Sequence, residues 1–143
     1  MNMKINKIVG LFDVLSKASL SKLEDADKYI VIKMLRKLRP ISEKFEADKK
    51  DAYERLRPEN WTEIAEKSNQ WREENNSQEL TDDEKRYILK VNECLADELN
   101  REEDVDLPKL SEEAFGKLMS CNEWNNLLAL ELSEMLVVDD ASE

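Results

Sequence analysis

The residues of this chain that could do chemistry are its 33 Asp and Glu, because histidine is absent. Without histidine, the Ser-His and Cys-His nucleophile pairs and most zinc sites are excluded. Two glycines are too few for a glycine-rich loop that holds phosphate. Cys94 and Cys121 lie on separate predicted helices without metal-ligand spacing, which indicates reduced thiols. Any catalysis would therefore depend on carboxylates.

Two acidic groups have a spacing that a magnesium site could use: Glu102, Glu103 and Asp106, followed by Glu131 and Glu134. In this pattern the chain resembles the helical nucleotide pyrophosphatases of the MazG type, which bind magnesium through paired acidic motifs. The resemblance implies a magnesium-dependent pyrophosphohydrolase. Magnesium needs several oxygen ligands that converge on a walled site, whereas the first group lies in a predicted connector. We therefore expect no catalytic, cofactor or metal site, and we keep the enzyme as a third alternative.

Helices must position these side chains, because the composition is 38% charged with few glycines and prolines. Strands and tight turns would need more glycine and β-branched residues. A length of 143 residues suits a single domain, 1–143. We predict an all-α fold of five or six helices, built on an N-terminal helical hairpin with a long kinked amphipathic helix. Residues 1–57 form the basic hairpin half and residues 58–143 the acidic half, with a frayed tail at 139–143.

The longest helical pattern runs from Leu23 to Leu56. Its apolar residues recur every three or four positions on one stripe: Ile30, Met34, Leu38, Ile41, Phe45, Ala52 and Leu56. Pro40 lies in the middle and lacks an N–H, so we expect a kink or a break there and leave the choice open. A shorter amphipathic helix over 3–16 precedes a turn at 16–21, which lets the two helices pack as an antiparallel hairpin.

Capping signals mark the middle of the chain. Asn60 and Thr81 each stand three residues before a Glu, which is typical of a capping box. Trp61 and Trp71 share one face of the helix that follows Asn60, so we expect both in the core. The next helix covers residues 82–101.

The last third of the chain begins with an extended connector over 102–110, in which a short edge strand is possible. Ser111 then caps a helix over 112–120, and Asn122 caps a last helix over 123–138. This last helix is apolar on more than one face, so it is either central in the core or shared with a second chain. We predict that five of its residues contact a partner: Trp124, Leu128, Leu132, Met135 and Leu136.

Charge is unevenly distributed along the chain. Residues 1–57 carry a net charge of +5 and residues 58–143 a net charge of −16. Such polarity suits head-to-tail packing and would steer a charged partner, although solvated helix faces would show it too. We interpret four cations of the long helix as a patch for an acidic partner: Lys33, Arg36, Lys37 and Arg39. Seven acids of the second half could imitate nucleic-acid phosphates: Asp82, Asp83, Glu98, Glu102, Glu103, Asp104 and Asp106.

These patterns predict a non-enzymatic protein that binds another protein or assembles with itself as a homo-oligomer. The alternative is an acidic inhibitor that imitates nucleic acid and binds in the basic groove of a host protein. We expect no direct contact with nucleic acid, because four glutamates surround the tryptophan pair: Glu63, Glu66, Glu73 and Glu74. We expect no contact with a membrane either, because no apolar run reaches about 18 residues. The start of the chain has no cleavable signal, so we expect a soluble, cytoplasmic protein.

The order of the predicted helices and the connector along the chain also resembles that of a known group of proteins. A leading helix, a long basic helix of the KYIVIKMLRKLRPISEKFEADKK kind, and a VDLPKLSEE connector into a leucine-rich terminal helix follow one another. In this order the chain resembles small helical proteins encoded in phage and prophage structural gene clusters. The resemblance covers most of the chain, brings no functional residues with it, and implies a bacterial host cell or a phage particle as the location.

Overall fold

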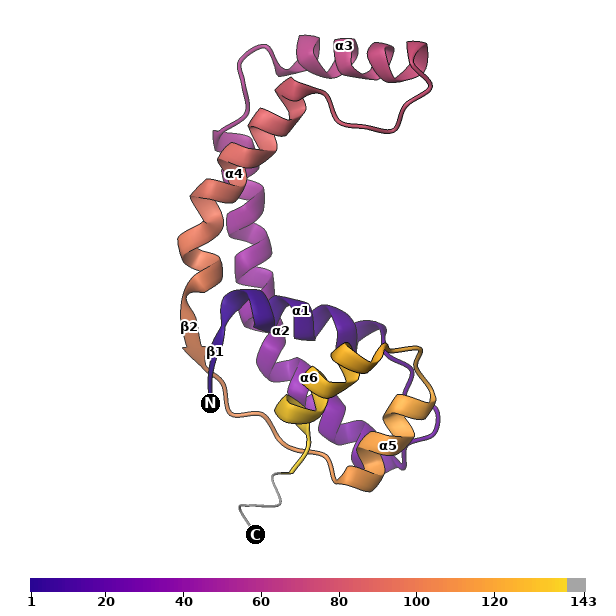
Figure 1. Ribbon diagram of the computed structural model, residues 1–143. Helices are drawn as coiled ribbons and strands as arrows, with labels where there is room; N and C mark the ends of the chain where they lie inside the picture. The colour runs from indigo at the N-terminus through magenta and orange to yellow at the C-terminus, as the bar shows by residue number, and fades with distance from the viewer. Residues whose placement is uncertain (139–143) are drawn as a thin grey trace. The chain divides into compact units, whose positions relative to one another are not determined.

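The computed structural model describes residues 1–138, which form two compact units (Figure 1). The first unit comprises Met1–Glu43 and the chain from Glu102 onward, and the second comprises Lys44–Arg101. These borders differ from the predicted division into residues 1–57 and 58–143, since the basic start of the chain and the acidic connector share one unit. The tail at 139–143, predicted to be frayed, lies outside the described residues.

The predicted all-α class is confirmed. Within residues 1–138 the chain forms six helices: α1 (Ile5–Lys17), α2 (Asp25–Arg55), α3 (Trp61–Glu74), α4 (Asp82–Asn100), α5 (Glu112–Ser120) and α6 (Asn126–Leu136). Two three-residue strands, β1 (Asn2–Lys4) and β2 (Glu102–Asp104), make up the described sheet. None of the described helices combines the length and the apolar character that spanning a membrane would need.

The long predicted helix is α2, and it continues through Pro40 without a break. Pro40 has no N–H and so cannot donate the usual helical hydrogen bond. Because Pro40 is exposed, this gap in the hydrogen bonding lies on the side of the helix that faces solvent. The apolar stripe stays in phase on both sides of it: Met34, Leu38, Phe45 and Ala52 are all buried. Burial of this stripe holds the helix together across the proline.

In the first unit, β1 and β2 pair antiparallel, with Lys4 opposite Glu102. The Met1 ammonium donates to the Asp104 carboxylate at 2.9 Å. The extended connector and its edge strand are therefore confirmed. The prediction of a helix that begins at residue 3 was wrong, because the backbone of residues 2–4 pairs with the connector and α1 starts only after it.

The core of the first unit is formed by residues that are all 5% exposed or less, from five segments: Ile5, Ile8, Leu11, Leu15, Val31, Met34, Leu38, Val105, Leu107, Leu110, Ala114, Phe115, Leu118, Leu132 and Leu136. Backbone hydrogen bonds fix the connector to the end of α6. The Leu110 N–H donates to the Leu136 carbonyl at 2.7 Å, and the Val138 N–H donates to the Leu110 carbonyl at 2.9 Å. These bonds hold the C-terminal end of α6 against the connector.

The prediction that Asn122 caps the last helix was wrong. Its side chain instead accepts from the Ser19 N–H at 2.8 Å and donates to the Ser19 carbonyl at 2.9 Å, which joins the α1–α2 loop to the end of α5. The cap of α6 is Asn125, whose side chain accepts from the Leu128 N–H at 2.8 Å. The helix therefore starts at Asn126 and not at residue 123. Ser111 caps α5 as predicted, accepting from the Ala114 N–H at 3.1 Å.

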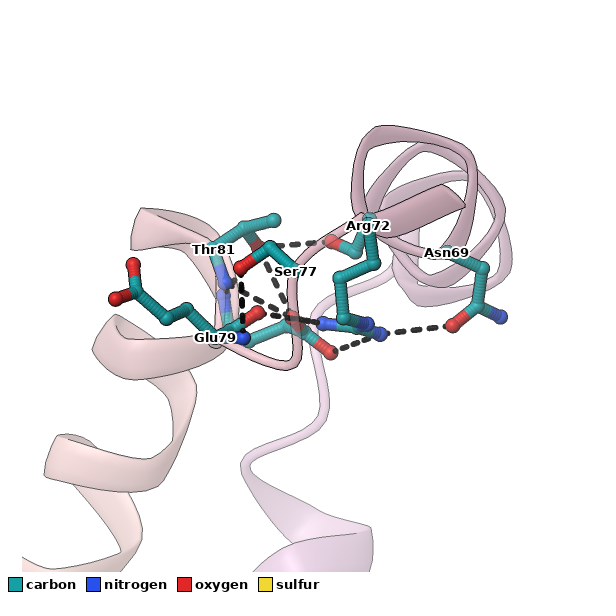
Figure 2. A network of polar contacts seen from close by, with 7 residues as sticks. Asn69, Arg72, Ser77, Glu79 and Thr81 are labelled. Carbon is teal, nitrogen blue, oxygen red and sulfur yellow. Dashed lines mark hydrogen bonds and ion pairs between the residues drawn. The ribbon is translucent and has the colours of Figure 1, made fainter. Parts of the chain in front are cut away.

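In the second unit, a polar network joins α3 to the start of α4 (Figure 2). The predicted capping box at Thr81 is present, since the Thr81 hydroxyl accepts from the Glu84 N–H and the Glu84 carboxylate accepts from the Thr81 N–H. The Arg72 guanidinium donates to both oxygens of Glu84 and, at 2.7 Å, to Asn69. The Ser68 and Thr81 hydroxyls are 2.8 Å apart. This network is part of the fold rather than an open site.

Two predictions for the second unit were wrong. Asn60 precedes α3 but makes no side-chain capping bond, because its backbone angles are not those of an extended cap residue. Trp71 is 40% exposed and so lies outside the core. Trp61 is half-buried, with its ring centroid 4.7 Å from that of Tyr87. Tyr87 in turn stacks on Tyr53, with the ring centroids 5.5 Å apart, so Trp61, Tyr87 and Tyr53 form one aromatic cluster.

Candidate functional site

The two most exposed large apolar side chains among the described residues of the first unit lie on the outer face of α6. Asn125 fixes where the helix starts, and Leu132 and Leu136 then face the core at 1% and 0% exposure. This orientation turns Leu127 and Leu130 outward, with 66% and 54% of their surfaces exposed. The two leucines are three residues apart and so are neighbours on the helix surface. We call Leu127 and Leu130 the α6 ridge.

A groove of about 460 Å³ lies between α1 and α6, and we call it the α1 groove. Leu128, Leu132 and Met135 line it from α6, and Leu11 and Val14 line it from α1. Its other lining residues are polar or small: Lys4, Asn6, Lys7, Gly10 and Glu131. The α1 groove therefore has apolar walls and two lysines that could meet negative charge.

A second groove of about 380 Å³ lies between α5 and α6, and we call it the α5 groove. Phe115, Gly116 and Met119 line it from α5. Leu130, a member of the α6 ridge, lines it from α6. Glu112 is its charged lining residue, and no lysine or arginine is among the described residues that line it. The α6 ridge thus adjoins an apolar groove on the α5 side.

Of the five predicted contact residues on the last helix, Leu132 and Leu136 are 1% and 0% exposed, so both belong to the core of their own chain, and their contact role stays a prediction. Leu128 and Met135 are half-buried and meet in the α1 groove. Trp124 is half-buried, precedes α6 and lines neither groove. The contact role of these three residues stays a prediction.

The α6 ridge itself was missed by sequence reasoning. A helix predicted to start at residue 123 and apolar on several faces gave no way to choose the outward side.

Three of the four predicted basic residues gather in one pocket of about 410 Å³. Lys33, Arg36 and Lys37 line it together with the connector residues Asp106, Leu107 and Pro108. The Lys37 ammonium donates to the backbone carbonyl of Asp106, and so fixes the connector against α2.

The ring of Tyr29 orders the other two cations of this basic pocket. The Lys33 nitrogen and the Arg36 guanidinium carbon lie 4.8 Å and 5.7 Å from the ring centroid, within the range of cation–π attraction. Arg39 does not belong to the pocket. It pairs with Glu43 at 2.7 Å, and hydrogen bonding to that carboxylate raises the pKa of Arg39.

The seven acids predicted to imitate nucleic acid fall into both units. Asp82, Asp83 and Glu98 lie on α4, whereas Glu102, Glu103, Asp104 and Asp106 lie on β2 and the connector. Several pair with cations of their own chain: Asp83 lies 3.0 Å from Arg86, Glu98 lies 3.7 Å from Arg101, and Asp104 binds the Met1 ammonium. Part of this acidic charge is therefore used within the fold, and the nucleic-acid mimic stays a prediction.

The acids considered for magnesium do not converge. Among residues 1–138, no group of three or more Asp, Glu or Cys side chains is arranged to hold a metal ion. Glu131 lines the α1 groove, while Glu102 and Glu103 pair along β1. The spacing that resembled the pyrophosphatases does not produce a set of ligands in this part of the chain.

Comparison of the chain with protein-family models, with curated proteins and with solved structures finds no match in any of the three. The α6 ridge, its two grooves and the basic pocket are therefore interpreted from their own geometry and chemistry.

Proposed function

We propose that this protein acts by protein–protein contact, without catalysis, and that it associates with a second copy of itself through the α6 ridge. The exposure of Leu127 and Leu130 carries the proposal. Single exposed leucines are common on protein surfaces. Two neighbouring leucines beside apolar grooves form a continuous patch, and such patches mark interaction sites. Burying the exposed part of each leucine would stabilise an association by about 1–2 kcal/mol, because the chain already covers a third to a half of each side chain.

Light scattering after size exclusion, over a series of protein concentrations, tests this proposal. The wild-type chain should reach twice the 16.7 kDa of one copy. The double variant Leu127→Glu with Leu130→Glu should keep the mass of one copy and an unchanged far-ultraviolet circular dichroism spectrum, because both side chains are exposed.

Leu89→Glu is the matched control, since Leu89 is 56% exposed on α4 of the other unit and should not affect the mass. A wild-type chain that keeps the mass of one copy at every concentration would rule out self-association. An equal effect of Leu89→Glu would remove the reason for assigning the contact to α6.

Self-association also suits the setting that the resemblance to phage and prophage proteins implies. We propose an assembly role of this kind, in a bacterial host cell or a phage particle.

The basic pocket supports a second contact, with an acidic partner. Three cations line it against one acidic residue, Asp106, and Tyr29 and the connector order their side chains. A polyglutamate peptide should bind the wild-type chain more weakly as salt is raised, because exposed charges are screened. The double variant Lys33→Gln with Arg36→Gln should lose the peptide, whereas Arg39→Gln, outside the pocket, should retain it. Equal loss in both would show that total charge, and not the pocket, attracts the peptide.

A further inference from the structure

Both glycines of the chain lie inside helices and line the grooves beside α6. Gly10 of α1 lines the α1 groove, and Gly116 of α5 lines the α5 groove. Glycine inside a helix is less stable than alanine by about 1 kcal/mol. A glycine is usually kept there because its backbone needs a positive φ or because a neighbour leaves no room for a Cβ.

Neither reason applies to these two glycines. Neither has a positive φ, and a Cβ built on either would meet no heavy atom within 4 Å. The chain alone therefore gains nothing from the missing side chains. What the missing side chains provide is open space on the wall of each groove, where another backbone or side chain could approach closely.

We propose that the α1 groove, at Gly10, receives the α6 ridge of a second copy. This inference rests on the proposed self-association and adds which surface receives the ridge. Leu127 and Leu130 of one copy would lie over Gly10 of the other, between the apolar walls made by Leu11 and Leu128. Ridge-into-groove packing of this kind is the usual way in which helices meet.

Charge selects the α1 groove over the α5 groove. Glu131 and Glu134 are exposed and flank the α6 ridge. Lys4 and Lys7 line the α1 groove, and neither these lysines nor the two glutamates form an ion pair with a described residue. A ridge with acidic flanks would therefore meet two lysines there against one acidic residue of the groove itself, Glu131.

The α5 groove would instead bring that ridge against Glu112. Like charges brought together oppose binding, and opposite charges fix its orientation.

The position of the ridge also predicts two-fold symmetry. Glu131 lines the α1 groove and flanks the α6 ridge, so the receiving and the inserted surfaces are neighbours on one helix. A two-fold axis beside α6 lets each copy insert its ridge and receive the other at once. The expected assembly is a closed dimer and not an open chain of copies.

Filling each groove in turn tests the assignment. Gly10→Trp places a large side chain in the α1 groove, and Gly116→Trp does the same in the α5 groove. Both replace a helical glycine by a better helix former, so neither should unfold its helix. Measured by light scattering over a dilution series, Gly10→Trp should raise the dimer dissociation constant at least about tenfold, the equivalent of one lost leucine contact. Gly116→Trp leaves the α1 groove open and should raise the dissociation constant less than Gly10→Trp does, through its contact with Leu130 of the ridge alone.

A mixing experiment tests whether ridge and groove are partners. The Leu127→Glu, Leu130→Glu chain has a damaged ridge and an intact α1 groove, whereas the Gly10→Trp chain has the reverse. Each alone should be a single copy, and an equimolar mixture should form a mixed dimer through the one contact that remains. Absence of any mixed dimer would overturn the pairing of ridge and groove.

The outcomes separate this inference from the proposed function. A wild-type chain that never dimerises would refute both. A wild-type dimer that Gly116→Trp dissociates and Gly10→Trp leaves intact would keep self-association and place the ridge in the α5 groove. A wild-type dimer that neither variant affects would show that both grooves are outside the contact.

Discussion

Replacing Leu132 by alanine should lower the free energy of unfolding of the first unit by about 3 kcal/mol. Leu132 is 1% exposed and belongs to the core, although its sequence pattern predicted a partner contact. The change removes about three buried carbon groups, at about 0.8 kcal/mol each, and the cavity left behind adds to the loss. Leu132 also lines the α1 groove, so part of the vacated space opens to solvent. This places the loss in the lower half of the range of about 2–5 kcal/mol found for buried leucines.

Urea unfolding at a dilution where the chain is a single copy measures this loss. Dilution matters, because association through α6 would add to the apparent stability. Trp124 lies in the first unit, and Trp61 and Trp71 lie in the second. In a background with Trp61→Phe and Trp71→Phe, fluorescence therefore reports the first unit alone.

Leu127→Ala is the matched control for this measurement. It makes the same chemical change on the same helix at 66% exposure, and should change the free energy of unfolding by less than about 0.5 kcal/mol. A loss below about 1 kcal/mol for Leu132→Ala, or equal losses for both variants, would refute the assigned orientation of α6. Leu132 would then face outward, as the sequence pattern predicted.

Three further changes test features within each unit. Hydrogen bonding to Arg72 lowers the pKa of Glu84 below its ordinary 4.5, so this pair stabilises the second unit above pH 4.5 and the effect is lost as the pH falls through the lowered value. Urea midpoints of the wild type and Glu84→Gln should therefore differ near neutral pH and converge in acid, whereas a constant difference would contradict the pairing. Thr81→Ala should cost about 1–2 kcal/mol by removing the cap of α4, and Thr81→Ser should keep most of that stability. Gly116→Ala should raise the stability of the first unit by up to about 1 kcal/mol, and a decrease would mean that the space beside Gly116 is filled.

The features that could be predicted from sequence depend on residues close together in the chain. Ser111 and Thr81 cap helices as predicted, because each cap needs only a hydroxyl and the N–H three residues later. The α2 stripe was predicted for the same reason, since helical periodicity places its residues on one face without help from the rest of the fold. Pro40 could not be decided locally, because burial on both sides of it determines whether the helix continues.

The features that could not be predicted depend on distant partners. Asn122 has the side chain of a helix cap, but Ser19, about 100 residues earlier in the chain, takes its hydrogen bonds. The helix instead starts at Asn126, and burial of Leu132 and Leu136 by distant parts of the chain determines that the ridge faces outward. Residues 2–4 are extended for a similar reason, because they pair with β2, which lies about 100 residues later in the chain. No local pattern contains this information.

Leu127 and Leu132 show why composition could not separate core from contact surface. They are the same residue type on one helix, and they differ in what covers them: the chain buries Leu132 and leaves Leu127 exposed. Gly10 and Gly116 carried a sequence signal of a different kind. Both occur inside strongly amphipathic helical patterns, where glycine lowers stability, so each position needed a reason. The fold supplies no such reason within the described residues, and the proposed approach of a second copy would supply one. Under this proposal, the glycines inside the predicted helices carry information on the contact surface that apolar periodicity alone does not give.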